Sequence, residues 1–482
     1  MMSSQSTILV LGVGPVPPEG PTRLMAPGLR VWSLAEVLAR AGHRVVLAEA
    51  AFGKGDGTPA REMREEAIDL PHGVELWRVS ADGARVAAFC RRLHAERGFA
   101  AAVANSDVMA AALCAARLSC PVWLDINGHP MAERQMLAAV YGSDSGLVAQ
   151  WRLLVPILLG GDRYSTCSEA QRRALLGELA FAGRFEPTSG PALACSIPAV
   201  AHEVDLKPTG PAARGRQVPA DARIVLWTGG YNTWTDVETL FEALSMAMEA
   251  DPGLWFVSTG GAIDGHDDQT FRRFRERVDR SALRARFVFA GWVPSREVAN
   301  YYAEADVAVL IDANSVEGRL GTRTRLIEWI QAGVPIAATP LCELALGLAS
   351  AGGLAPYAIG DARALAEAIG RLSSDRAQAR RQADRAREYL RRHHDAATAC
   401  APLLAWAARP IPAPDLPAPS QRAAGSGADS EGPLTSRLMA RWGSAERDRS
   451  AGDGLMGSVG SWLRRRLWEC AKRLGCQAGK DP

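Results

Sequence analysis

Residues 307–312, VAVLID, and residues 315–335, SVEGRLGTRTRLIEWIQAGVP, decide the fold. The first stretch is a short run of continuous apolarity, which is typical of a strand buried on both faces of a parallel sheet. In the second stretch apolar residues recur at helical spacing after a polar turn; Thr322 or Thr324 can cap this helix, and Gly333 can end it. A buried strand, a polar turn and an amphipathic helix form the repeating unit of an α/β fold.

The same alternation of short apolar runs and longer amphipathic stretches extends in two series over most of the chain. The runs of the first series are TILVLGV (7–13), RVVLAEA (44–50), VELWRV (74–79), FAAAVAN (99–105), PVWLDIN (121–127) and YSTCS (164–168). Those of the second are RIVLWTGG (223–230), LWFVSTGG (254–261), RFVFAGWV (286–293), VAVLID (307–312) and PIAAT (335–339). The pattern predicts two Rossmann-like, doubly wound parallel-sheet domains that face a cleft.

The composition of the connecting stretches sets the predicted boundaries. A polar stretch with Pro and Gly separates the two series, and a stretch rich in Pro, Ala, Gly and Ser follows the second. We predict an N-terminal domain (1–205), a linker (206–220), a C-terminal domain (221–395), a closing helix (396–409), a disordered linker (410–440) and a basic amphipathic tail (441–482). Within the flexible tail, apolar residues recur at helical spacing over 455–475 between arginines and lysines. Such a helix binds an anionic membrane surface or packs on the protein's own domains, and the sequence leaves both open.

The overall composition limits the function classes. With 482 residues and a formal net charge of +2, the chain has no strong basic field for sequence-independent nucleic-acid binding. Its 9 cysteines are scattered without a CxxC pair, which is typical of reduced thiols in the cytosol. The first residues lack a basic leader, and no run approaches the roughly 18 to 20 apolar residues that cross a bilayer. We therefore expect a cytoplasmic protein, with contact to the inner membrane face only through residues 455–475.

The arginine-rich turn is the main candidate site. Arg323 and Arg325 follow a strand of the second domain, at the edge where open α/β sheets bind ligands, and guanidinium groups suit a diphosphate. Glu328 can accept hydrogen bonds from two ribose hydroxyls, and Glu317 from sugar hydroxyls. The alternatives are a solvated charged face and an Arg325–Glu328 ion pair at i, i+3. Gly229 and Gly230, after another strand, permit close approach of the backbone to a ligand.

The opening loop is a second candidate. Gly12 and Gly14 follow the first strand, but Pro15 intervenes and a third glycine is missing, which argues against a nicotinamide site. Gly28 and Arg30, at the start of the next helix, are placed to bind a phosphate at its free amides. An ordinary turn with a solvated Arg30 remains the alternative.

A third group of polar residues follows the strand of residues 121–127. Asp125, Asn127 and His129 can hold sugar hydroxyls or act as acid or base, although Asp125 can equally cap the next helix. Glu133 is expected to be solvated. Asp267 and Asp268 lack neighbouring metal ligands, so we expect them to contact solvent and expect no metal site.

At this point the chain resembles a known family. The segments APGLRVWSLAEVLARAGHRVVLA, CSEAQRRALLGEL, VFAGWVPSREVANYYAEADVAVL and RTRLIEWIQAGVPIAAT are together similar to the retaining, nucleotide-sugar-dependent glycosyltransferases of family 4, which have the GT-B fold. The likeness covers residues 7 to about 345. It is closest to a bacterial polysaccharide-type subgroup with an Arg-Thr-Arg motif.

The resemblance implies roles for individual residues. It implies that Glu317 touches the donor sugar, Glu328 the ribose, and Trp292 and Val293 the base, while Gly28 backs the phosphates. The family needs no divalent metal and no cofactor besides its nucleotide-sugar donor.

Two departures from the family pattern lie in the second domain. Ten residues separate Glu317 from Glu328 where the family has seven, and Leu320 stands at the expected position of the first glutamate. The turn GGYNTWTD (229–236) lacks the family's Arg and Lys. We therefore hypothesise that Arg323 and Arg325 have taken over the phosphate role.

The prediction is a glycosyltransferase that moves a sugar from a nucleoside diphosphate to a glycan or lipid-linked acceptor in cell-surface polysaccharide biosynthesis. The C-terminal domain would bind the donor, and the N-terminal domain the acceptor through Asn127 and His129. The predicted catalytic residues are Arg323, Arg325, Glu317 and Asp125, and the predicted donor-binding residues are Gly28, Arg30, Gly229, Gly230, Trp292, Val293 and Glu328. The alternatives are a catalytically silent nucleotide- or glycan-binding scaffold and an epimerase on the same fold.

Overall fold

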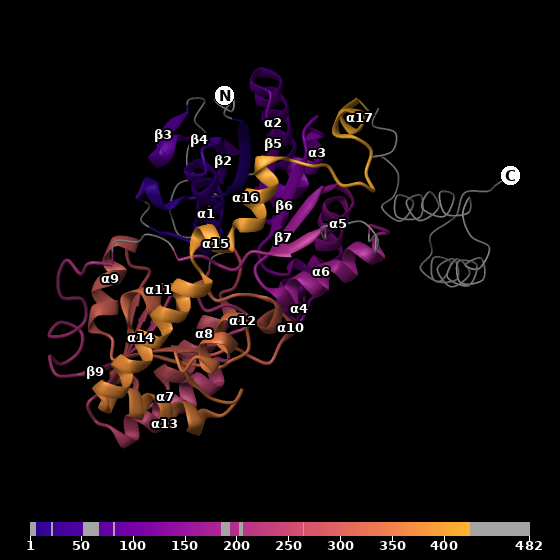
Figure 1. Ribbon diagram of the computed structural model, residues 1–482. Helices are drawn as coiled ribbons and strands as arrows, with labels where there is room; N and C mark the ends of the chain where they lie inside the picture. Colours follow the sequence, from indigo (N-terminus) through magenta and orange to yellow (C-terminus); the bar gives the residue numbers. More distant parts are fainter. Residues whose placement is uncertain are drawn as a thin grey trace, which may run out of the picture.

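The computed structural model describes residues 6–20, 23–51, 67–80, 82–184, 193–201, 206–263 and 265–424. They form two α/β domains, with the end of the chain crossing from the second back to the first (Figure 1). The predicted fold class of two parallel-sheet domains is confirmed. The predictions for residues 425–482, including the amphipathic segment 455–475, lie outside the described residues.

The first domain is built on an eight-stranded sheet in the order β3-β4-β2-β1-β5-β6-β7-β8, parallel except for the β3–β4 pair. Its strands are β1 (Thr7–Val13), β2 (Arg44–Ala51), β3 (Ile68–Leu70), β4 (Val74–Ser80), β5 (Ala101–Asn105), β6 (Val122–Ile126), β7 (Arg163–Thr166) and β8 (Ala194–Ser196). Its helices are α1 (Ala26–Arg40), α2 (Gly83–Arg97), α3 (Asp107–Ala116), α4 (Pro130–Tyr141), α5 (Ser145–Gly160) and α6 (Glu169–Phe181), with short 3-10 turns η1 (Pro17–Glu19) and η2 (Pro71–Gly73).

Strand β1 explains why these strands are apolar throughout. Ile8 and Val10 pack against α1 on one face of the sheet, and Leu9 and Leu11 pack on the other face; all four are fully buried. Because successive side chains point to opposite faces and helices cover both, every position of the strand is a core position.

The second domain has a six-stranded parallel sheet in the order β11-β10-β9-β12-β13-β14. Its strands are β9 (Arg223–Thr228), β10 (Leu254–Thr259), β11 (Phe287–Gly291), β12 (Val307–Leu310), β13 (Ile336–Ala338) and β14 (Ala355–Pro356). Its helices are α7 (Val237–Ala250), α8 (Gln269–Asp279), α9 (Ser295–Glu304), α10 (Val316–Leu320), α11 (Thr324–Ala332), α12 (Glu343–Ser350), α13 (Ala362–Ser374) and α14 (Arg376–His393), with the turn η3 (Arg284–Arg286). The strand order reverses between β9 and β12, and the carboxyl ends of these two strands are the place where open α/β sheets bind ligands, called the crevice below.

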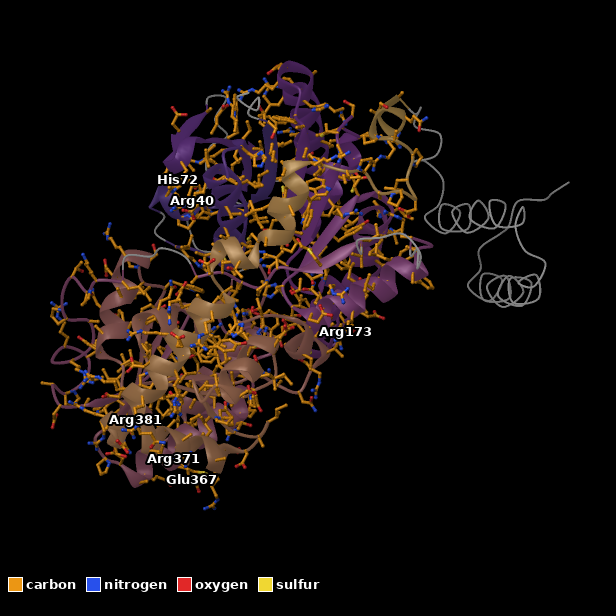
Figure 2. All side chains as sticks on the ribbon, viewed as in Figure 1. Arg40, His72, Arg173, Glu367, Arg371 and Arg381 are labelled. Carbon is orange, nitrogen blue, oxygen red and sulfur yellow. The ribbon has the colours of Figure 1, made fainter. Side chains whose placement is uncertain are left out.

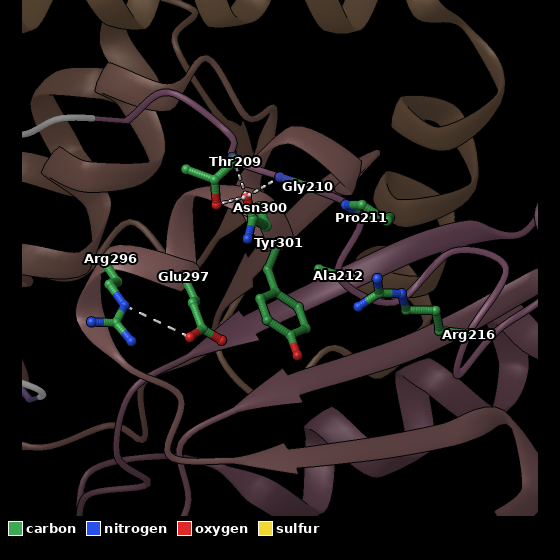
Figure 3. Close-up of a pocket in the computed structure, with 9 residues that line it drawn as sticks. All are labelled: Thr209, Gly210, Pro211, Ala212, Arg216, Arg296, Glu297, Asn300 and Tyr301. Carbon is green, nitrogen blue, oxygen red and sulfur yellow. Dashed lines mark hydrogen bonds and ion pairs between the residues drawn. The ribbon is translucent and has the colours of Figure 1, made fainter.

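The linker between the domains is bound tightly to α9. Asn300 Oδ1 accepts hydrogen bonds from the backbone N–H groups of Thr209 and Gly210, and the Glu304 carboxylate accepts three more from residues 212–214. A surface pocket of about 330 Å³ lies beside this anchor (Figure 3). Tyr301 of α9 is one of the residues that line it.

After α14 the chain returns to the first domain through α15 (Ala396–Ala399) and α16 (Ala401–Ala408) (Figure 1). The Trp406 ring packs on Trp123 with centroids 5.3 Å apart, and Leu403 is fully buried in the same core. The closing segment therefore ties the domains together through an apolar contact.

Residues 410–424, expected to be a disordered linker, run along the first domain and end in α17 (Pro419–Ala424). Asp415 pairs with Arg184 at 2.7 Å, and Arg422 pairs with Asp162 at 2.7 Å. Composition suggested flexibility, but Arg184 and Asp162 are buried charges that need partners, and this stretch supplies them. No helix within the described ranges is long and apolar enough to cross a membrane.

Candidate functional site

Loops from both domains meet around the crevice at β9 and β12. Ser168 of the first domain donates to the backbone oxygen of Leu320 at 2.6 Å, and the Tyr141 hydroxyl donates to Asp267 at 3.0 Å. These contacts place α4 and the start of α6 against α10 and the loop before α8. Residues that follow strands in both domains therefore face one another.

The arginine-rich turn contains two short helices instead of one. Ser315 caps α10 by accepting a hydrogen bond from the Gly318 N–H at 2.9 Å. Helix α11 begins at Thr324, with Arg323 at the cap position and no side-chain cap, so the predicted threonine cap is wrong. Gly333 ends α11 in the left-handed conformation, with φ of 78°, as predicted.

Arg323 is held by two carboxylates. It is 5% exposed; its Nε donates to Asp312 at 2.9 Å, and its two Nη atoms donate to the Glu317 oxygens at 3.0 and 2.8 Å. Its guanidinium also lies 5.1 Å from the Trp234 ring centre. The charge of Arg323 is thus already balanced by protein groups, and the geometry assigns Arg323 and Glu317 to shaping the turn. The predicted phosphate role of Arg323 and sugar contact of Glu317 would have to compete with this ion pair.

Arg325 differs from Arg323 in the partners of its guanidinium group. Its Nη2 donates to the Gly230 carbonyl at 2.8 Å, and its guanidinium lies 4.4 Å from the Trp227 ring centre, but its buried Nη1 has no hydrogen-bond acceptor among the described residues. Burial, together with the positive charge of Arg323, lowers the pKa of Arg325 to about 10. A half-buried cation with a buried, unused donor and a lowered pKa has no direct anionic partner in the described part of the chain.

The environment of Arg325 differs from that of the arginines on the outer surface. Figure 2 labels several of these, including Arg40, Arg173 and Arg371, whose side chains are 47%, 76% and 54% exposed. Each has a carboxylate of its own helix within 4 Å. The solvated alternative thus describes these residues and not the crevice pair.

The turn after β9 gives Arg325 its close backbone contact. Gly229 has φ of +83°, a conformation that only glycine adopts without strain, and a Cβ on Gly230 would lie 2.3 Å from the Ile263 side chain. Both predicted glycines therefore lie at the crevice, and both are needed to bring this turn against Arg325 and the β10 loop.

Glu328 accepts a hydrogen bond from the Tyr302 hydroxyl at 2.5 Å, and burial raises its pKa. The alternative of an Arg325–Glu328 ion pair is not what the structure shows, because Arg325 turns to Gly230. Glu328 remains one turn into α11, next to the crevice.

Trp292 lies at the far side of the Gly229–Gly230 turn. Its indole N–H donates to the Ala262 carbonyl at 3.1 Å, and the guanidinium of Arg23 from the first domain stacks 3.4 Å from its ring centre. Val293 is half-buried and packs against the core of the second domain. The expected base-contact loop is thus at an interdomain position, with Arg23 over the indole face.

Gly28 and Arg30, predicted to bind a phosphate, both make contacts inside the first domain. A Cβ on Gly28 would lie 2.0 Å from the Pro15 carbonyl, so this glycine lets α1 pack against the loop after β1. Arg30 is 4% exposed, donates to Asp125 at 2.9 and 2.8 Å, and donates to Pro198. The charge of Arg30 is thus paired with Asp125, and the phosphate role of Gly28 stays a prediction.

The carboxylate of Asp125 is likewise occupied by hydrogen bonds inside the first domain. It is fully buried, and besides Arg30 it accepts hydrogen bonds from Asn105 at 2.8 Å and Ser165 at 2.5 Å. Four hydrogen bonds fill its oxygens, so it neither caps the next helix nor offers a free base. The catalytic expectation for Asp125 is corrected to a structural one.

The expected acceptor residues lie at the start of α4. His129 caps this helix, its Nδ1 accepting from the Ala132 N–H at 3.2 Å, and its Nε2 is 3.3 Å from Glu178. Asn127 is half-buried in the turn before it. Asp267, expected in solvent, is 1% exposed and binds Tyr141.

Sequence reasoning missed Glu133. It lies in the first turn of α4, against α10, and its carboxylate is so close to Gly128 (φ +88°) that a Cβ there would lie 2.3 Å from Glu133 Oε1. Burial, with the nearby carboxylates of Glu317 and Asp107, raises its pKa to about 8. The available signal was that Asp107, Glu133 and Glu317 each follow a strand end, where side chains of different loops converge.

Replacing Glu133 by Gln is expected to remove a proton-linked loss of stability. With a pKa of about 8 against an ordinary 4.5, Glu133 binds its proton more tightly in the folded chain. The contribution of protonated Glu133 to the free energy of unfolding is fully present below pH 4.5 and is lost as pH rises through about 8. At pH 8 we expect E133Q to melt about 2–4 °C higher than wild type, the effect of about 1 kcal/mol, with little difference at pH 4.5. E249Q, on the surface, is the control; equal pH profiles for wild type and E133Q would contradict the prediction.

Among the described residues, no group of three or more His, Cys, Asp or Glu side chains is arranged to hold a metal ion. The positive charge in the crevice comes from Arg325 instead.

The fold resembles several solved structures. Sucrose-phosphate synthase from Thermosynechococcus elongatus is 20% identical with a TM-score of 0.61, over 83% of this chain and 97% of that one. The E. coli trehalose-6-phosphate structure bound with UDP-2-fluoro glucose is 10% identical with a TM-score of 0.58, over 84% and 100%. The alpha,alpha-trehalose-phosphate synthase (UDP-forming) of Burkholderia xenovorans in complex with glucose-6-phosphate is 13% identical with a TM-score of 0.61, over 84% and 100%. The fold is therefore GT-B.

The sequence of the second domain points to a class of protein more specifically than the fold does. Residues 222–375 match the family model described as Glycosyl transferases group 1. Among curated proteins, no relative matches the sequence. The matched segment holds β9, the Gly229–Gly230 turn, Arg325 and Glu328, and the match indicates a glycosyltransferase.

Proposed function

We propose that this protein transfers a sugar from a nucleoside diphosphate to an acceptor, and that Arg325 binds the diphosphate. The observation that carries the proposal is the buried Nη1 of Arg325 without an acceptor, beside the Gly229–Gly230 turn at the carboxyl end of β9. A phosphate oxygen there supplies both the missing hydrogen-bond acceptor and the missing negative charge.

The proposed chemistry uses the same group. As the bond between sugar and diphosphate breaks, negative charge grows on the departing phosphate. A fixed guanidinium in a partly buried site stabilises that charge without needing to reorganise. Arg323, already neutralised by Asp312 and Glu317, keeps the turn in shape so that Arg325 points to the crevice.

The finer parts of the proposal rest on the resemblance to family 4. We propose transfer of a hexose with retention, Glu328 binding the ribose, and a glycan or lipid-linked acceptor of a cell-surface polysaccharide reaching the crevice from the side of Asn127. The E. coli and B. xenovorans structures hold UDP-2-fluoro glucose and glucose-6-phosphate in the same fold, which supports a sugar nucleotide and a sugar acceptor as substrates.

The test is a screen of UDP-, GDP-, ADP- and dTDP-sugars with the purified chain. Binding is measured by calorimetry, and slow release of the nucleoside diphosphate is followed without acceptor. An active transferase binds at least one donor and hydrolyses it slowly. Binding without any hydrolysis would favour a silent scaffold, and an isomerised sugar nucleotide would favour an epimerase. No binding to any member would refute the proposal.

Contact of residues 455–475 with an anionic membrane is also a proposal, supported by their basic, amphipathic pattern. We expect the full chain to sediment with vesicles containing anionic lipid and residues 1–424 alone to stay in the supernatant. Equal partition of the two would contradict it.

A further inference from the structure

A series of buried hydrogen bonds leads to Glu328, and the chemistry of the side chains determines which group donates and which accepts in it. The Trp329 indole N–H donates to the Thr228 hydroxyl oxygen at 2.9 Å. Indole has a donor and no acceptor, so Thr228 must accept from it and keeps its own proton to donate. Burial raises the pKa of Tyr302, and a side-chain hydrogen bond from Thr228 opposes that rise. Tyr302 in turn donates its proton to Glu328 Oε2 at 2.5 Å.

Every link of this chain is buried. Trp329, Thr228 and Tyr302 are 0%, 5% and 4% exposed. The three come from different elements, namely α11, the end of β9 and α9. A buried polar network whose donors and acceptors are all paired has one arrangement, since any rotation leaves a group unsatisfied. The network therefore fixes the orientation of the Glu328 carboxylate.

The charge state of Glu328 depends on the same bond. Burial raises the pKa of Glu328, while the Tyr302 hydrogen bond and the positive charge of Arg325 oppose that rise. These are the titratable and charged groups that face it from α9 and from its own helix; on the α14 side, Arg387 contacts α11 at the distant Gln331. Without the Tyr302 hydroxyl, Glu328 would take up a proton at higher pH and lose its capacity to accept two hydrogen bonds.

We propose that Tyr302 is a positioning residue that holds Glu328 as an acceptor for the two ribose hydroxyls of the donor, so that the Trp329–Thr228–Tyr302 network sets a preference for ribonucleotides over 2′-deoxyribonucleotides. This inference rests on the proposed function. It goes beyond it by assigning sugar discrimination to a residue that itself touches no ligand.

The experiment compares wild type with Y302F, which removes one hydroxyl and keeps the ring. The matched control is Y301F, because Tyr301 is the neighbouring tyrosine of α9 and points into the linker pocket instead (Figure 3). The probes are the nucleoside diphosphate selected by the donor screen and its 2′-deoxy analogue, with affinities measured by calorimetry between pH 5.5 and 8.

For wild type we expect the ribonucleotide to bind about tenfold tighter than the deoxy form, the worth of a hydrogen bond to a charged group. Y302F should reduce that ratio below about threefold, mainly by weakening the ribonucleotide. Its affinity should also fall as pH drops, because Glu328 then binds a proton, whereas Y301F should behave as wild type. T228V, which breaks the network one step earlier, should change the ratio in the same direction.

An unchanged ratio and pH profile in Y302F would overturn the inference, as would an equal effect in Y301F. A purely structural role for Tyr302 would weaken both nucleotides alike and would leave the ratio intact, which also overturns it. Failure of the proposed function itself is distinguishable, since wild type would then bind neither nucleotide.

Discussion

Replacing Arg325 by Met is expected to weaken binding of the nucleoside diphosphate by about 10- to 100-fold while leaving the unliganded protein as stable as wild type or more so. The loss follows from removing a charged hydrogen-bond donor, worth about 1.5–3 kcal/mol. The retained or increased stability follows because burial lowers the pKa of Arg325 to about 10 and no carboxylate of the described ranges pairs with it. Met keeps most of the volume without the buried charge.

Calorimetric titration with the selected nucleoside diphosphate, and thermal unfolding without it, measure the two effects. R325K should lie between wild type and R325M, because an ammonium group restores the charge but not the planar fork. R319A is the control in the same turn, since Arg319 is exposed and bonds only Asn314 among the contacts the structure describes for it. Unchanged affinity in R325M would remove the main support for the proposed function.

Replacing Arg323 by Ala is expected to lower the stability of the protein, whereas R325M mainly lowers the affinity for the nucleoside diphosphate. The effect of R323A on stability should be the larger of the two. Asp312 and Glu317 are 2% and 3% exposed, and both pair with Arg323. Removing the cation leaves two buried carboxylates unpaired, which costs about 3–5 kcal/mol of the free energy of unfolding. Urea unfolding at pH 7 measures the loss.

A combined variant separates charge from packing. R323M with D312N and E317Q removes all three charges at similar volume, and we expect it to recover most of the stability lost in R323A. A stable R323A that has lost only nucleotide affinity would show that Arg323, and not only Arg325, binds the phosphate, and would restore the original hypothesis for both arginines.

The fold was predictable because its signal is local. A parallel strand covered by helices on both faces has only core positions, as Ile8 to Leu11 show, so the apolar runs mark each strand without knowledge of its partners. The end of α11 at Gly333 was predictable for a similar reason, since one residue must adopt a positive φ there. The start of α11 was not, because Arg323 takes the cap position where its side chain reaches Asp312 and Glu317.

The location of the candidate site could be predicted from the sequence, but the role of each residue in it could not. Arg323 and Arg325 have the same chemistry and stand two positions apart, so nothing in the sequence tells which one is neutralised. Arg30 and Asp125 were each assigned to ligand chemistry, yet they pair with each other across 95 positions of the chain. Glu133 was assigned to solvent, and its carboxyl group lies among others from distant loops.

By itself, the sequence determined two α/β domains, a crevice at the strand ends and an arginine-rich turn beside it, because hydrophobic periodicity and helix stops are encoded by neighbouring residues. Only the tertiary structure decided which charges meet. Whether a buried guanidinium is free for a ligand depends on the carboxylates within a few ångströms, and these come from other strands and loops. Within the part of the chain that the structure describes, Arg325 has no such carboxylate, whereas Arg323 and Arg30 each have one.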